Sequence, residues 1–246
     1  MDNKKLLIKF PTRSRPDKFK SVFTKYIDLL SGLYDVRFVI TMDNDDETMN
    51  NDDIRSWLDG LIERGYDIAY HYGDSKTKIE AVNANMEGEK ADILLLASDD
   101  MVPELMGYDA MIFQAMDEAF PEYDGAIKFN DGIRQDNLMT LAIMGWKLYE
   151  KFGYIYYPGY KSLYADTEQT FACAAMNKFA VHPACIIRHV WVPGDHEEAD
   201  ELHQSQESRE MYEYDGKIFE ERQKTNFDLD RMMSANDILE NAINEN

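Results

Sequence analysis

The sequence predicts an α/β fold, in which helices cover both faces of a mostly parallel β-sheet and a helical extension follows at the C-terminus. In the first 100 residues, short apolar runs alternate with segments whose apolar residues recur at helical spacing. This alternation implies right-handed strand–helix–strand crossovers and therefore parallel strands. With 246 residues, of which 44% are hydrophobic and 12% aromatic, the chain can bury one sizeable core. We expect a single domain over residues 1–246.

The strands expected in the first half are short apolar runs bounded by Pro, Gly or Asp. They lie at residues 6–10, 36–41, 66–71 and 92–97. One helix is expected after Pro16, where apolar residues recur at helical spacing over 19–30. Another is expected over 54–62, with Asp52 or Asp53 as its N-cap.

The second half has weaker periodicity and contains Gly and Pro turns. We expect strands at residues 123–128, 138–144 and 185–192, and a helix at 167–176. The last 52 residues hold sixteen acidic and five basic residues. Their apolar positions predict surface helices that pack through one apolar face and are charged on the other.

Charge and cysteine content exclude several classes of protein. The net charge of −21 disfavours nonspecific adhesion to nucleic acid or anionic membranes. Residues 1–25 are the exception, with eight basic residues against two acidic ones, which predicts a basic edge on an acidic body. No apolar stretch approaches the ~18 residues of a membrane helix, and no secretion signal is evident, so we expect no membrane partner. Cys173 and Cys185 lack the spacing of a zinc site or disulfide framework, which indicates buried, reduced thiols in a cytoplasm-like compartment.

Three loops follow the first, second and fourth expected strands, at residues 11–16, 42–47 and 98–103. Ligands of open α/β sheets bind at the carboxyl ends of the strands, so we expect these loops to meet around a ligand. The third loop places Asp99 and Asp100 directly after an apolar run. Carboxylates are preferred ligands of Mg²⁺ and Mn²⁺. Alternatively, the two acids only end the strand and cap a following helix.

The order of the short motifs resembles that of family-2-type glycosyltransferases with the GT-A fold, over about residues 6–192. Residues 11–16 read Pro-Thr-Arg-Ser-Arg-Pro after the first strand, and Asp43 follows the second. Lys78 and Asn83 share a helix before the acidic loop, and the loop itself reads Ser-Asp-Asp over residues 98–100. The resemblance implies transfer of a sugar from a nucleotide sugar, with UDP as the expected nucleotide. It divides the domain into a nucleotide-sugar-binding half (1–105), an acceptor-binding half (106–193) and an acidic helical extension (194–246).

By this resemblance, the nucleotide sugar would be bound by Pro11, Thr12, Arg13, Arg15, Asp43, Lys78, Asn83, Ser98 and Asp99. A Mn²⁺ or Mg²⁺ cofactor on Asp99, Asp100 and His189 would stabilise the departing diphosphate. The Ser-Asp-Asp motif departs from the common Asp-x-Asp form, so the sequence leaves open whether Asp99 or Asp100 is the chief ligand. Simple structural roles compete with these assignments: Asp43 lies in an acidic turn, Lys78 suits a solvated helix face, Asn83 can pack or cap, and His189 can be a core residue.

Asp166 is the candidate catalytic base, because it precedes a predicted helix where the family carries an acidic pair; here Ala165 replaces the first acid. A carboxylate in that place can remove the proton of an acceptor hydroxyl. Its alternative role is to cap the helix. Five tyrosines crowd residues 154–164 and suggest an acceptor-binding loop, since aromatic rings pack well on sugar faces. Residues 194–196, which end at His196, suggest a loop over the diphosphate.

The acceptor remains open at this level. The small size and the segment His-Val-Trp-Val-Pro at 189–193 are similar to virus- or phage-encoded transferases, some of which modify hydroxymethylated pyrimidines in DNA; the enzyme would then act in the host cytoplasm. Duplex DNA would require an extruded base. A glycan acceptor is the alternative. A sugar-1-phosphate nucleotidyltransferase is disfavoured because residues 11–16 contain no glycine, and a non-catalytic nucleotide-binding module because both Asp99 and Asp100 are present.

Overall fold

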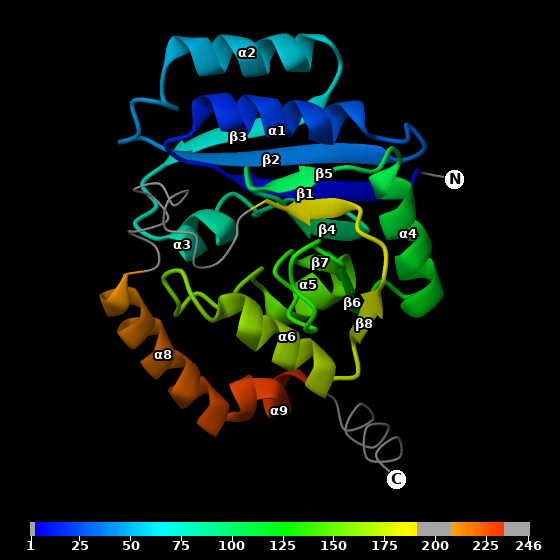
Figure 1. Ribbon diagram of the computed structural model, residues 1–246, viewed down its shortest axis with the longest axis vertical. Coiled ribbons are helices and arrows are strands. Elements are labelled where there is room, and N and C mark those ends of the chain that lie inside the picture. The colour runs from blue at the N-terminus through cyan, green and yellow to red at the C-terminus, as the bar shows by residue number, and fades with distance from the viewer. Residues whose placement is uncertain (1–2, 191–207, 234–246) are drawn as a thin grey trace.

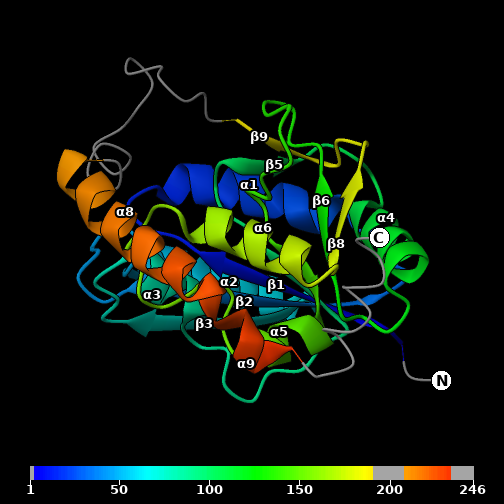
Figure 2. The ribbon, with the colours of Figure 1, turned by 90° about the horizontal axis from the view of Figure 1, so that it is seen from below.

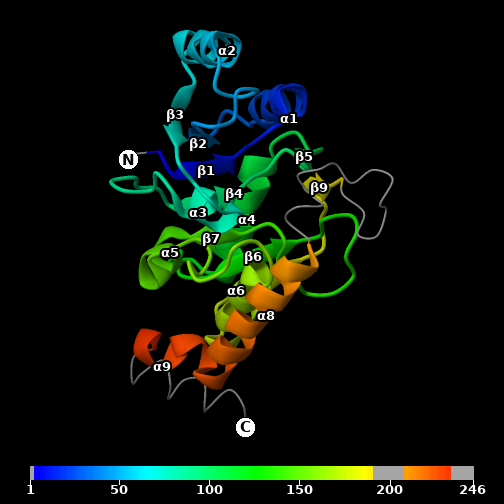
Figure 3. The same ribbon diagram turned by 90° about the vertical axis from the view of Figure 1, so that its left-hand side faces the viewer.

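The computed structural model describes residues 3–190 and 208–233 and is built around a seven-stranded sheet (Figure 1). The strand order is β3-β2-β1-β4-β7-β6-β8, and Figure 3 shows the strands descending from β3 at the top towards β6. Four neighbouring strands are parallel: β3 (Asp67–Gly73), β2 (Asp35–Asp43), β1 (Lys5–Pro11) and β4 (Ile93–Leu96). The predicted mostly parallel sheet is confirmed, with all four strands of the first half close to their expected positions.

The second half of the sheet has mixed directions. Strand β7 (Ile143–Gly145) is antiparallel to both β4 and β6 (Ala126–Phe129), and β6 is parallel to β8 (Phe179–His182). The strand expected over 138–144 is therefore much shorter and runs against its neighbours. Strands β5 (Met101–Pro103) and β9 (Ile187–His189) form a separate antiparallel pair. Within the described residues, β9 is the part of the strand expected at 185–192 that forms.

Helices cover both faces of the sheet, and each group of helices shares one apolar cluster. Buried side chains of α1 (Pro16–Asp28), α2 (Asp52–Glu63) and α4 (Tyr108–Ala119) pack with Leu6, Ile8 and Phe10 of β1. Those of α3 (Lys78–Asn83), α5 (Trp146–Phe152) and α6 (Ala165–Ala175) pack with Leu7 of the same strand. Successive residues of a strand point to opposite faces, so β1 contributes to both clusters. Helices α4 and α5 and strand β8 were not predicted from the sequence.

Local signals set where the first helices begin. Pro16 occupies the first turn of α1, where its missing N–H and fixed φ are tolerated. The predicted caps of α2 were wrong: Asn51 is the N-cap, and its side chain accepts a hydrogen bond from the backbone N–H of Ile54 (3.1 Å). Asp52 and Asp53 follow directly in the first turn, where their charges interact favourably with the positive end of the helix.

The C-terminal helix α8 (Arg209–Lys224) is followed by the short α9 (Leu229–Met232). Ile218 and Phe219 of α8 pack against the same apolar cluster as α6, as predicted, whereas its buried positions are polar, Asp215 and Arg222. Arg222 Nη2 donates to the buried carboxylate of Glu168 on α6 (2.8 Å), which also accepts from the hydroxyl of Tyr160 (2.8 Å). Figure 2 shows α8 lying along α6. Burial of this ion pair is tolerated because each charge meets several partners.

Asp215 fixes the loop that leads into α6. Its two carboxylate oxygens accept hydrogen bonds from the backbone N–H groups of Lys161 (2.9 Å), Ser162 (2.9 Å) and Leu163 (2.7 Å). The carbonyl of Lys161 in turn accepts from the backbone N–H of Ile79 at the start of α3 (3.2 Å). The buried carboxylate of Asp215 thus holds residues 161–163, and this loop connects α8 with α3.

Among the described residues, no helix is both long and apolar enough to cross a membrane. Both cysteines are free; Cys173 is buried and Cys185 is half-buried, so the prediction of two buried thiols holds for Cys173 alone.

Replacing Asp215 by alanine should lower the free energy of unfolding by roughly 3 kcal/mol, because three backbone donors lose their buried acceptor. Denaturant unfolding followed by circular dichroism measures the change. The control is Glu213→Ala on the same helix, whose side chain forms only an exposed pair with Arg209 and should change stability by less than ~0.5 kcal/mol. Equal effects of the two substitutions would contradict the anchoring role of Asp215.

Candidate functional site

The loops after β1, β2 and β4 meet at the carboxyl edge of the parallel strands, as the sequence predicted. The register pairs Pro11 with Thr41, and the backbone N–H of Thr12 donates to the carbonyl of Thr41 (3.0 Å). The end of β1 therefore lies against the end of β2. On the other side, the backbone N–H of Ala97 donates to the carbonyl of Lys9 (2.8 Å), which brings the Ser-Asp-Asp loop to the same edge.

The loop after β1 is held by the acidic turn after β2. Arg13 Nη1 donates to Asp43 (2.8 Å) and to Asp45 (2.7 Å), and its hydrogen bonds to the carboxylates of Asp45 and Asp43 raise the pKa of the guanidinium. The backbone N–H of Ser14 donates to the buried carboxylate of Asp46 (2.6 Å). Ser14 has a φ of +63°, a left-handed conformation that this contact helps to stabilise. The acidic turn is thus a scaffold for residues 12–15.

Two oxygen atoms at this junction are buried without a hydrogen-bond partner within the described residues, namely Thr12 Oγ1 and Asp43 Oδ1. Both residues are at most 8% exposed. Most buried polar atoms in proteins are hydrogen-bonded, and an unpaired one costs free energy. Two such atoms on adjacent strand ends are therefore well suited to bind polar groups of a ligand.

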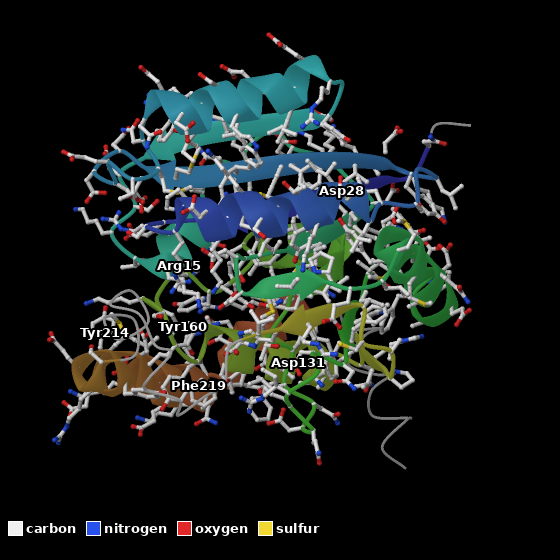
Figure 4. The ribbon with its side chains drawn as sticks, turned by 45° about the horizontal axis from the view of Figure 1, so that its top comes forward. Arg15, Asp28, Asp131, Tyr160, Tyr214 and Phe219 are labelled. Atoms are coloured by element: carbon white, nitrogen blue, oxygen red, sulfur yellow. The ribbon has the colours of Figure 1, made fainter. Side chains whose placement is uncertain are left out.

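Asp99 and Asp100 turn in different directions. Asp99 is buried, and its carboxylate accepts from Arg15 Nη1 (2.9 Å) at the start of α1; Figure 4 shows Arg15 at that end of the helix. Burial raises the pKa of Asp99, and the charge of Arg15 acts in the opposite direction. Two-residue periodicity at a strand end explains why neighbours diverge.

Asp100 faces His189 instead. Its side chain accepts from the hydroxyl of Ser98, and its Oδ2 lies 3.6 Å from His189 Nε2. The β5–β9 register pairs Met101 with His189, and the backbone N–H of Val190 donates to the carbonyl of Asp100 (2.9 Å). The element after Asp100 is strand β5, so the alternative in which these acids cap a helix is wrong.

The donor set around Asp100 fits a divalent cation that is completed by a substrate. Carboxylate and imidazole together suit Mn²⁺ better than Mg²⁺, and such ions often keep water or phosphate oxygens as further ligands. Within residues 3–190 and 208–233, three or more His, Cys, Asp or Glu side chains do not converge as a closed metal cage. Asp99, the third predicted ligand, points to Arg15. The segment at 191–196, including His196, lies outside the described residues.

The predicted base and two further predicted residues lie on the other face. Burial raises the pKa of Asp166, while the charge of Lys78 lowers it, so these two groups from α6 and α3 are neighbours in space. The Asp166 carboxylate accepts from the backbone N–H of Thr167 (2.7 Å). Asn83 binds the backbone of Ile155 (2.8 Å) and Tyr156 (2.7 Å), which holds α3 against that segment. For Asn83 the structure shows the packing role.

The tyrosines of residues 154–164 mainly pack against one another. Tyr156 and Tyr160 are buried, and Tyr157 forms edge contacts with both Tyr154 and Tyr160. The guanidinium of Arg222 lies 3.8 Å from the centre of the Tyr157 ring. This cluster therefore supports the loop before α6, and its predicted role in acceptor binding stays a prediction.

The predicted basic edge does not form as expected. Lys4 pairs with Asp117 (2.7 Å), Lys5 with Asp67 (3.6 Å) and Lys20 with Asp53 (2.5 Å). Arg13 and Arg15 pair with the acids described above. Lys9 is buried, where its ammonium donates to the hydroxyl of Thr41 and to the carbonyl of Ala84 (2.7 Å). Most of the positive charge of residues 1–25 is therefore compensated within the fold.

Lys9 and Asp46 were missed as parts of the site, and so was Asp131, a buried acid in the loop after β6. Asp131 accepts from the backbone N–H of Ile133 (3.0 Å) and Arg134 (2.8 Å), and its carbonyl accepts from the N–H of His189 (2.8 Å). A lysine inside an apolar strand and the turn sequence Asn-Asp-Gly at 130–132 were the available signals.

Comparison with known proteins identifies the fold. No protein-family model matches the chain, and no curated protein sequence matches it. Among solved structures, the mannosyltransferase PcManGT from Pyrobaculum calidifontis in complex with GDP-Man and Mn²⁺ superposes with a TM-score of 0.60 at 15% identity, over 80% of this chain and 60% of that one.

Two structures of TarS from S. aureus are also similar. One has a TM-score of 0.60 at 12% identity, over 78% of this chain and 37% of that one. The structure of residues 1–349 in complex with UDP has a TM-score of 0.59 at 12% identity, over 75% and 60%. The chain thus spans less than two thirds of each of these proteins. At these identities the likeness shows the fold, which is the α/β fold of these glycosyltransferase structures, as the resemblance implied.

Replacing Lys9 by methionine should remove a distinct pH dependence of stability. Burial lowers the pKa of Lys9 to about 7, against 10.5 for an ordinary lysine. Between these values the folded protein holds fewer protons than the unfolded chain, so stability rises with pH, by up to about 1.4 kcal/mol per pH unit from this group. Denaturant unfolding of wild type and Lys9→Met from pH 6.5 to 10 measures the difference.

The matched control is Lys5→Met on the same strand, whose partly exposed side chain lies beside Asp67. This variant should keep the wild-type slope. Equal slopes for wild type and Lys9→Met would show that Lys9 stays charged in the fold.

Proposed function

We propose that the protein is a metal-dependent glycosyltransferase, which moves a sugar from a nucleotide sugar to an acceptor hydroxyl. The observation that carries this proposal is the convergence of four groups at one sheet edge. The unpartnered oxygens of Thr12 and Asp43 lie on adjacent strand ends, and Asp100 lies beside His189 on the next loop. The similar structures bind GDP-Man with Mn²⁺ and UDP, which supports a nucleotide-sugar donor.

Thr12 and Asp43 are proposed to bind the nucleoside, since a base or ribose offers the hydrogen-bond donors that Asp43 Oδ1 lacks. Arg13 orients Asp43 by donating to its other oxygen. UDP is the proposed nucleotide. Pro11 fixes the strand end, and Ser98 orients Asp100 through its hydroxyl.

Asp100 and His189 are the proposed ligands of the cation, Mn²⁺ in preference to Mg²⁺. When bound, the cation would supply positive charge to the diphosphate that leaves as the bond to the sugar breaks. Asp99 is proposed to act through Arg15. The buried ion pair holds the guanidinium next to the site, and it neutralises the carboxylate of Asp99. Arg15 is then placed to contact phosphate oxygens.

Asp166 is proposed as the base that takes the proton from the acceptor hydroxyl. Burial raises the pKa of Asp166, which makes the carboxylate a better proton acceptor than an exposed aspartate. The charge of Lys78 nearby lowers the pKa of Asp166 and so favours its ionised form. This role implies transfer with inversion at the sugar carbon.

A glycan or other soluble carbohydrate is the proposed acceptor, in preference to hydroxymethylated DNA. Binding to a DNA backbone draws on Lys and Arg that neutralise phosphates. In residues 1–25 most of these side chains are paired with acids or buried. The net charge of −21 adds repulsion.

A thermal-shift titration tests donor and metal binding. UDP with Mn²⁺ should raise the melting temperature, and neither alone should reproduce the full shift, because stabilisation grows with the concentration of a ligand that binds only the folded state. GDP with Mn²⁺ is the comparison nucleotide. Asp100→Asn should lose most of the metal-dependent part, whereas Asp52→Asn on the exposed face of α2 should behave as wild type. A flat response to every nucleotide and metal would contradict the proposal.

Replacing Asp166 by asparagine should lower kcat by about 10²–10⁴-fold and leave UDP affinity unchanged, since only proton transfer is lost. Initial rates with UDP-sugars and a panel of glycan acceptors measure the effect. In wild type, activity should fall as pH decreases through the raised pKa of Asp166, because its protonated form cannot accept the hydroxyl proton. Asp230→Asn, at an exposed position, is the control. Full activity of Asp166→Asn would exclude it as the base.

A further inference from the structure

A cavity lies between β6, β8 and the loop that follows β6. It has a volume of about 340 Å³. Figure 2 shows β6, β8 and β9 in one region, with the loop after β6 extending beyond them. The polar and charged residues that line it include Lys128, Asn130, Arg134, Asp136 and His182.

Lys128 is the unusual member of this set. It lies on β6 and is 5% exposed, and its side chain forms neither a hydrogen bond nor an ion pair with the residues that the structure describes. By contrast, Lys178, which follows α6, forms an ion pair with Asp124 (2.7 Å). Lys128 lines the cavity, so its ammonium can meet oxygen atoms of an anion there.

The acids near Lys128 are already engaged by other donors. Burial alone would raise the pKa of Asp131, but the pKa is lowered by hydrogen bonds from the backbone of Arg134 and Ile133, by Thr140, and by the charge of Lys128. Asp136 is bound by two nitrogens of Arg134, Nε (3.0 Å) and Nη2 (2.5 Å). Lys128 is therefore the cation in the cavity whose charge is least compensated by contact.

His182 adds a neutral donor to the cavity. Its Nδ1 accepts from the backbone N–H of Ala184 (3.2 Å), so in the neutral ring the proton is on Nε2. The ring packs on Phe129 with centroids 4.8 Å apart, which fixes its orientation. An ammonium, an imidazole N–H and the amide of Asn130 then line one hollow, a set that suits oxygen atoms of an anion.

The cavity is connected to the proposed active site through the loop after β6. The carbonyl of Asp131 accepts from the backbone N–H of His189, and the backbone N–H of Asn130 donates to the carbonyl of Ala184 (3.1 Å). The charge of Arg134 also acts on Asp166, where it lowers the pKa of the carboxyl. An acceptor that reaches Asp166 can therefore extend towards Lys128.

We propose that this cavity binds an anionic group of the acceptor, a phosphate or a carboxylate, with Lys128 as the principal cation. The inference rests on the proposed glycosyltransferase function and names its acceptor class: a carbohydrate that carries a negative charge. The same chemistry could come from a sugar phosphate or from a uronic acid. Inorganic phosphate and D-glucuronate represent the two sources, and D-glucose is the neutral reference.

Titrations of the protein alone with these three compounds test the cavity without any transfer reaction. NMR signals of the His182 ring should shift on addition of phosphate or glucuronate and stay unchanged with glucose. Lys128→Met should weaken the affinity for the anion by about tenfold or more. Lys147→Met changes an exposed lysine of α5 that pairs with Glu122, and this variant should bind the anion as wild type does. The relative affinities of phosphate and glucuronate identify the source of the anion.

Melting temperatures give a second measurement that is independent of NMR. Without anion, Lys128→Met should melt at or above the temperature of wild type, because no side-chain hydrogen bond or ion pair is lost and the side chain keeps a similar length. Phosphate should stabilise wild type and leave Lys128→Met unchanged. A Lys128→Met protein that melts at a much lower temperature would show that Lys128 is structural and would overturn the inference.

The outcomes separate this inference from the proposed function. If UDP and Mn²⁺ bind but no anion perturbs His182, the glycosyltransferase proposal survives and the anionic acceptor is excluded. If Lys128→Met binds anions as tightly as wild type does, the proposed role of Lys128 is likewise excluded and the glycosyltransferase proposal survives. If anions bind in a Lys128-dependent way but no nucleotide binds, the cavity is an anion site and the proposed function fails.

Discussion

An acidic chain can bury carboxylates only where donors meet them, and this constraint shapes the site. With a net charge of −21, the protein still buries Asp43, Asp46, Asp99 and Asp215. Each meets a guanidinium or backbone N–H groups: Arg13 for Asp43, Ser14 for Asp46, Arg15 for Asp99, and three consecutive amides for Asp215. Because buried charge without such partners is costly, these contacts fix the loops at the carboxyl edge in one arrangement.

The same constraint explains why the C-terminal helix belongs to the functional unit. Asp215 holds the loop at 161–163, whose carbonyl at Lys161 also meets the start of α3. Glu168 and Arg222 lock α6 to α8 through a buried pair. Lys78 on α3 and Asp166 on α6 are thereby placed near each other, although they come from different halves of the chain. An apolar contact would stabilise α8 equally well, but it would not specify the position of the loop as closely.

Polar atoms that are left without partners are as informative as those that have them. Thr12 Oγ1 and Asp43 Oδ1 are unpaired at the strand ends, and Lys128 lacks a counter-charge in contact within the described part of the chain. Their positions agree with two proposed binding roles: the oxygens of Thr12 and Asp43 accept hydrogen bonds from a nucleoside, and Lys128 on β6 binds an anion. Strands β1, β2, β4 and β6 run in the same direction, so both places lie towards the carboxyl ends of parallel-running strands of one sheet.

Sequence alone determined the elements that depend on neighbouring residues. The strands β1 to β4 and the helices α1, α2 and α6 follow from the apolar pattern, α3 from the family resemblance, and the loops expected at 11–16, 42–47 and 98–103 from the rule for parallel strands. Only the tertiary structure decided the antiparallel direction of β7, the polar packing of α8, and the split in which Asp99 meets Arg15 while Asp100 meets His189. Each of these depends on partners far apart in the chain. Such pairings are set by the three-dimensional balance of burial and charge, which local periodicity does not encode.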